Sequence, residues 1–114
     1  MANLPTETLT TIANLLSRLF EVINLATATE YNLFEQYGER EETVLELEEL
    51  GNAAERARLY YNRLYGLTLQ VAESQPVANS AIINLLQQSI EEAEATTYSV
   101  EATVQEIKKN WNLL

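Results

Sequence analysis

The sequence predicts an all-α protein, an antiparallel bundle of three long, coiled-coil-like helices. Apolar residues recur at alternating steps of three and four, the spacing of a helix that buries one face, and no segment keeps a strand's alternation of two. Only three glycines and two prolines interrupt the 114 residues. Gly38 and Pro76 divide the chain into three segments of nearly equal length, which suits an antiparallel bundle. We therefore expect a single domain over residues 1–114.

We expect the first helix at about residues 5–37. Pro5 stands at its start, where the missing backbone N–H of proline costs nothing. The apolar seam of this segment runs from Leu9 to Tyr37 and is interrupted only by Glu30. An unpaired carboxylate is costly to bury, so Glu30 either lies at an exposed edge of the seam or belongs to a binding site.

We expect the second helix at about residues 40–74. Three glutamates stand at its expected start, where negative charge complements the helix dipole: Glu39, Glu41 and Glu42. Thr43 and Glu46 have the spacing of a capping box and offer an alternative, later start. Gly51 then lies inside the helix at a cost of about 1 kcal/mol relative to alanine.

We expect the third helix at about residues 77–112, directly after Pro76. Lys108 and Lys109 fall in its last turns, where positive charge is favourable. Because this helix runs antiparallel to the second, Trp111 should return to the first turn of the bundle and pack there as a core residue.

The alternative architecture is a bundle of four shorter helices with breaks near Thr27 and Gly51. Both places carry residues that are typical of helix starts. The apolar register, however, passes through both positions without a slip, whereas a loop would usually reset it. The sequence therefore favours three long helices.

The composition excludes several kinds of chemistry. The chain has 17 acidic and 7 basic residues, a net charge of -10, and all its acids are glutamate, with no aspartate, histidine or cysteine. Histidine-based acid–base catalysis, cysteine nucleophiles, disulfides and thiolate or imidazole metal sites are thereby ruled out. The charge argues against nucleic acid and anionic lipid as ligands, and no apolar run is long enough to span a membrane. We expect a cytoplasmic protein without a cofactor or catalytic residue.

Surplus apolar and aromatic residues predict a non-enzymatic protein–protein interaction or assembly module that self-associates. The stretch 56–65 combines arginine with tyrosine, two residue types enriched in interfaces, and the first helix has more apolar surface than its seam needs. A symmetric homodimer is the commonest outcome. The expected interface residues are Arg56, Tyr60, Arg63, Tyr65, Phe20 and Leu25. In a local alternative, the arginines instead pair with glutamates of neighbouring helices and the tyrosines fill gaps.

An acidic patch is the second candidate surface. Six glutamates occur between residues 39 and 49: Glu39, Glu41, Glu42, Glu46, Glu48 and Glu49. They predict a docking patch for a basic protein or, as an alternative, an inhibitor that mimics DNA. A solvated helix start, where glutamate complements the helix dipole, is the simpler explanation of these residues and the one that the sequence favours.

A carboxylate site for Mg²⁺ or Mn²⁺ is the enzymatic alternative. Its candidate ligands are Glu30, Glu46 and Glu49, and the last two share a helix face at a spacing of three. The stretch Glu48-Glu49-Leu50-Gly51-Asn52 resembles the second metal motif of the all-α NTP pyrophosphohydrolases. The resemblance implies a metal-dependent hydrolase, although that family usually has aspartate where Asn52 stands.

Overall fold

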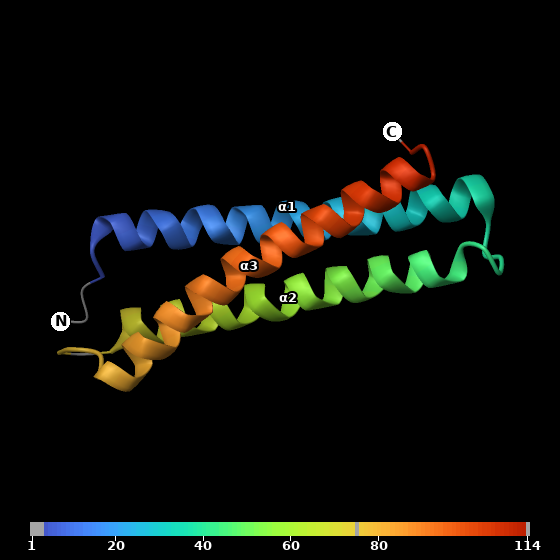
Figure 1. Ribbon diagram of the computed structural model, residues 1–114. Helices are drawn as coiled ribbons and strands as arrows, with labels where there is room; N and C mark the ends of the chain where they lie inside the picture. The colour runs from blue at the N-terminus through green and yellow to red at the C-terminus, as the bar shows by residue number, and fades with distance from the viewer. Residues whose placement is uncertain (1–3, 75, 114) are drawn as a thin grey trace.

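The computed structural model describes residues 4–74 and 76–113. These residues form three helices, α1 (Thr6–Tyr37), α2 (Val44–Glu73) and α3 (Ser80–Asn110), and no strand is found among them. All three helices pack against one another in a rod of 56 × 20 × 17 Å, with neighbours in the chain running antiparallel (Figure 1). The predicted antiparallel three-helix bundle is confirmed. Within the described ranges, none of the helices combines the length and the apolar character that a membrane crossing needs.

The four-helix alternative is wrong. Helix α1 continues through Thr27, whose hydroxyl donates to the carbonyl oxygen of Ile23 at 3.0 Å, and α2 continues through Gly51. The unbroken apolar register explains this, because each long helix buries a face along its whole length. That burial outweighs the local start signals at both positions.

Helix α2 begins at Val44, later than the expected residue 40. The hydroxyl of the buried Thr43 holds the preceding turn: it donates to the carbonyl oxygen of Gly38 at 2.7 Å and accepts from the Arg40 N–H at 2.9 Å. The side chain of Thr43 is therefore used in this turn and does not cap α2.

The start of α2 also differs from the prediction in its charges. The three glutamates expected in its first helical turn lie before the helix: Glu39, Glu41 and Glu42. Glu46 is the acidic residue of the first turn. The segment between α1 and α2 is thus a negatively charged turn of its own.

Helix α3 begins at Ser80 because Asn79 caps it. The side-chain oxygen of Asn79 accepts a hydrogen bond from the Ile82 N–H at 2.9 Å, which satisfies a donor that has no partner within the helix. Pro76 consequently lies outside the helix that it was expected to start.

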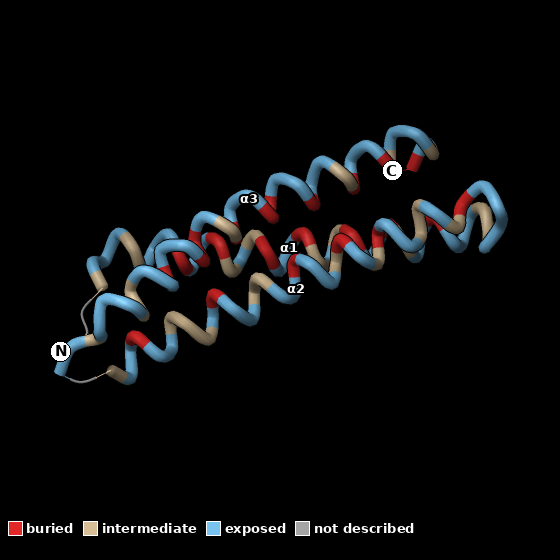
Figure 2. The backbone as a smooth tube through the Cα atoms, turned by 60° about the horizontal axis from the view of Figure 1, so that its bottom comes forward, coloured by how far each residue is buried: buried red, intermediate tan, exposed pale blue. Residues whose placement is uncertain are grey.

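The core runs along the inner faces of the helices (Figure 2). Four positions of the predicted α1 seam are buried: Ile12, Leu19, Ala26 and Leu33. The other buried positions come one residue earlier than predicted, at Leu15, Val22 and Thr29. The residues they replace, Leu16, Ile23 and Glu30, are half-buried at the edge of the core.

At the end of the rod where α1 turns into α2, an aromatic side chain of α1 packs against one at the end of α3. The rings of Tyr37 and Trp111 meet edge to face with centroids 5.0 Å apart, and the Tyr37 hydroxyl donates to the Trp111 carbonyl oxygen at 3.0 Å. The expected return of Trp111 to the first turn is confirmed. Gly38 ends α1 there with a φ of 74°, a conformation that favours glycine.

Candidate functional site

Polar side chains connect α3 to both of its neighbours. An ion pair joins Arg18 of α1 to Glu101 at 3.4 Å, and another joins Arg63 of α2 to Glu92 at 3.7 Å. Arg56 also donates to the Ser99 hydroxyl at 3.2 Å. Within residues 4–74 and 76–113, no ion pair or side-chain hydrogen bond joins α1 to α2. The α1–α2 surface therefore differs from the surfaces that α3 shares with its neighbours, which carry polar links between helices.

Aromatic side chains gather on that surface. Phe20 of α1 meets Tyr61 of α2 edge to face, with ring centroids 6.2 Å apart. Tyr61 in turn stacks on Tyr65 at 6.3 Å. Phe20 is 65% exposed and Tyr65 is 51% exposed, although both pack against a neighbour. We call Phe20, Tyr61 and Tyr65 the aromatic row.

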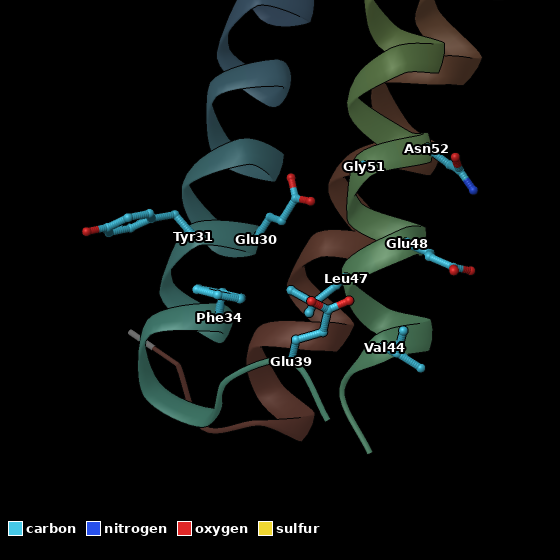
Figure 3. Close-up of a pocket in the computed structure, with 9 residues that line it drawn as sticks. All are labelled: Glu30, Tyr31, Phe34, Glu39, Val44, Leu47, Glu48, Gly51 and Asn52. Atoms are coloured by element: carbon cyan, nitrogen blue, oxygen red, sulfur yellow. The ribbon is translucent and has the colours of Figure 1, made fainter. Parts of the chain in front are cut away.

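A cleft of about 740 Å³ opens between α1 and α2 beside the turn that joins them (Figure 3). In Figure 3, Glu30 and Phe34 point from α1 towards α2, and Glu39 reaches up from the turn. Tyr31 and Glu48 point outward from the two sides. The remaining lining residues all belong to α2: Val44, Leu47, Gly51 and Asn52.

A second cleft of about 530 Å³ continues along the same surface and shares Glu30, Gly51 and Asn52 with the first. Its lining includes Arg58, which forms an ion pair with Glu55 at 3.7 Å. One helical turn further on, Arg58 is followed by Tyr61 of the aromatic row. We call the two clefts together with the aromatic row the α1–α2 groove.

Glu30 lies at the edge of the core and faces the first cleft. It is half-buried, and its Oε2 is 3.6 Å from the point where a Cβ atom would stand on residue 51. The carboxylate thus extends across the groove onto the bare backbone of Gly51. Glu30 was expected either at an exposed edge of the seam or in a binding site. The structure places it at the edge of the core, and that edge borders a cleft.

The expected interface residues do not form one surface: some lie in the groove, and others contact α3. Phe20 and Tyr65 lie in the groove, whereas Arg56 and Arg63 contact α3. Tyr60 is half-buried, and the Arg63 guanidinium carbon lies over the Tyr60 ring, 5.2 Å from the ring centroid. Arg63 thus pairs with a glutamate of a neighbouring helix, as the local alternative anticipates, whereas the α3 partner of Arg56 is a serine.

Leu25 is separated from the groove. It follows Arg18 by two helical turns and so shares its side of α1, where Arg18 lies over the Tyr98 ring of α3 at 5.3 Å. Leu25 is half-buried and packs against the core. Because Leu25 contacts the core, it is not part of the surplus apolar surface that was expected on the first helix.

The acidic residues near the start of α2 spread over several surfaces. Glu39 and Glu48 line the first cleft, and Glu48 also borders a cleft towards α3 together with Glu49. Glu41 and Glu42 are exposed in the turn, and Glu46 is half-buried in the first turn of α2. Only part of the predicted patch therefore faces the groove.

The three candidate metal ligands do not converge. Among the described residues, no three carboxylates lie close enough together to hold a metal ion, so Glu30, Glu46 and Glu49 form no such group. The stretch 48–52 is a continuous part of α2.

The sequence did not single out the apolar lining of the first cleft. Phe34, Val44 and Leu47 form it together with the backbone of Gly51. Phe34 stands fourteen residues after Phe20, which places both rings on the same side of α1. That spacing is the signal in the sequence that the two rings share one flank of α1.

In comparisons with protein-family models, with curated proteins and with solved structures, no match to this chain was found.

Proposed function

We propose that the chain is a non-enzymatic protein–protein interaction module whose docking surface is the α1–α2 groove. One observation supports this above all: the polar cross-links between helices all involve α3 among the described residues, while the α1–α2 surface carries exposed aromatic rings. Exposed apolar surface of this kind is typical of interaction sites.

A helix of another protein is the occupant that suits the groove best. Two antiparallel helices with an open groove between them offer the place that a fourth helix takes in a four-helix bundle. An amphipathic helix would lay its apolar side chains against Phe20 and Tyr65, residue types that often dominate binding energy in such contacts.

Site-specific photo-crosslinking tests this proposal. A photoreactive phenylalanine analogue replaces Phe20, Tyr65 or, as a control, Leu59, which is exposed and lines neither cleft of the groove. We expect adducts at positions 20 and 65 but not at 59, with mass spectrometry placing the linked peptide in an amphipathic helix of one protein. Equal labelling at all three positions, or none, contradicts the proposal.

The binding contribution of the aromatic row is measured with the partner so identified. Phe20→Ala combined with Tyr65→Ala should weaken binding about tenfold or more, because it removes two aromatic anchors. The matched pair Leu59→Ala and Leu85→Ala removes exposed leucines elsewhere and should change affinity little. Light scattering shows whether the partner is a second copy, by a mass twice the 12.9 kDa of one chain.

A further inference from the structure

We infer that the helix bound in the α1–α2 groove is basic at the end that lies beside the 38–43 turn, where its lysine or arginine side chains enter the first cleft. This inference rests on the proposed function and specifies the chemistry of its partner. The charges and the lining of the cleft support it.

The groove has an uneven charge along its length. Glu30, Glu39 and Glu48 line the first cleft, which has no lysine or arginine in its lining. None of the three forms an ion pair with another described residue. The second cleft shares Glu30 with the first, but its own glutamate, Glu55, is paired with Arg58, and the aromatic row beyond it is uncharged. Negative charge is therefore concentrated at one end.

The apolar lining of the first cleft suits long cationic side chains. Phe34 and Leu47 offer apolar surface to the methylene stem of a lysine or arginine, while Glu30 and Glu39 lie where its charged head would end. A cation can also lie over the Phe34 ring with a modest gain. Short polar or acidic side chains would satisfy neither part of this surface.

The same charges disfavour two other occupants of this end of the groove. A second copy of the chain would bring a further net charge of -10 against the three glutamates. Nucleic acid would bring phosphates. Like charges placed together in an interface cost several kcal/mol and suppress wrong partners. A basic helix of a different protein meets no such penalty.

The test uses designed peptides as probes. A labelled amphipathic peptide of about 18 residues, about 27 Å long as a helix, carries leucine along one face and four lysines at one end only. Two matched peptides have glutamine or glutamate in place of the lysines. Fluorescence anisotropy should show that the lysine peptide binds about tenfold more tightly than the glutamine peptide, and that the glutamate peptide binds least.

Protein variants then locate the effect. The triple variant E30Q/E39Q/E48Q should reduce the affinity for the lysine peptide to about that for the glutamine peptide. The control E7Q/E73Q/E106Q removes the same charge from exposed positions outside the groove, so both variants have a net charge of -7 (-10 + 3). The control should retain the preference for lysine. Equal losses in both variants would show general attraction by the acidic protein and overturn the inference.

The aromatic row separates failure of this inference from failure of the proposed function. If F20A/Y65A weakens binding of the glutamine peptide while E30Q/E39Q/E48Q leaves the lysine preference intact, the groove binds helices without charge selection. The inference is then overturned and the proposed function stands. If neither variant changes the binding of any peptide, both are overturned. Circular dichroism confirms beforehand that each variant is folded.

Discussion

At the scale of the residue, Thr43 determines the shape of the turn between α1 and α2. Its side chain is fully buried, and its hydroxyl is both donor and acceptor for backbone groups of that turn. The turn carries Glu39 into the first cleft. One hydroxyl group thus links the backbone conformation to the negative end of the groove.

Replacing Thr43 by valine keeps the shape of the side chain but removes the hydroxyl. The Arg40 N–H and the Gly38 carbonyl oxygen then lose their partner, so we expect the free energy of unfolding to fall by about 1–3 kcal/mol. Urea denaturation measures the change. Thr43→Ser, which keeps the hydroxyl, should be closer to the wild type. A valine variant as stable as wild type would contradict the role assigned to this hydroxyl.

At the scale of the element, the glycines have different roles in the helices. Gly38 ends α1 with φ at 74° and ψ at -179°, a region of backbone conformation that is essentially restricted to glycine. Gly51 and Gly66 lie inside α2, where their freedom is a cost. Replacement by alanine should therefore destabilise the protein at Gly38 and stabilise it at Gly51 and Gly66.

Alanine at each glycine tests this difference. Gly38→Ala should lower the free energy of unfolding by about 1–3 kcal/mol through backbone strain. Gly66→Ala should raise it by about 1 kcal/mol, because its Cβ would meet no atom within 4 Å. Gly51→Ala should also stabilise, since its Cβ would lie in ordinary contact with Glu30 at 3.6 Å. Urea denaturation of the three variants gives the signs, and a stabilising Gly38→Ala would be inconsistent with the structure.

The helices were predictable from periodicity, but their exact register was not. Leu15 and Leu16 are identical, and Val22 and Ile23 are both apolar, so either set continues the seam from Ile12. The structure buries the first of each pair. The one informative pair is Thr29 and Glu30, where the threonine is buried and its hydroxyl donates to the Leu25 carbonyl oxygen at 2.7 Å. An acidic residue on a predicted seam was thus the sign of a shifted register.

The site was less predictable because neighbours along a helix point in different directions. Successive residues are about 100° apart around the axis, so the stretch 56–65 cannot form one surface. Arg56 and Arg63 contact α3, whereas Tyr65 stacks on Tyr61, the ring that meets α1. Which flank remains open depends on where α3 packs. That is a tertiary property that the local sequence does not state.

At the scale of the whole molecule, the net charge of -10 works against the compact state. The three ion pairs among the described residues are between partly exposed side chains, and pairs of this kind contribute about 0–1 kcal/mol each. Repulsion among the remaining glutamates extends along the rod and is stronger when the solution contains little salt. We therefore expect repulsion to outweigh the ion pairs.

Raising the salt concentration should stabilise the bundle. Between about 0.01 M and about 0.1 M NaCl the Debye length falls from about 30 Å to about 10 Å, which screens the repulsion. The melting temperature, followed by circular dichroism, should rise over this range. The E7Q/E73Q/E106Q variant has less charge to screen and should show a smaller rise. A fall in melting temperature would mean that the ion pairs dominate.

The odd number of helices among the described residues has a mechanical consequence. Helix α1 begins at one end of the rod and α3 finishes at the other (Figure 1). A pulling force applied at those two points runs parallel to the helix axes. The helices must then slide lengthwise past one another, so many contacts resist the load at once. In a two-helix hairpin pulled from its open end, contacts would break one turn after another. Force applied at those two points would therefore load the bundle in shear, the stronger of these two geometries.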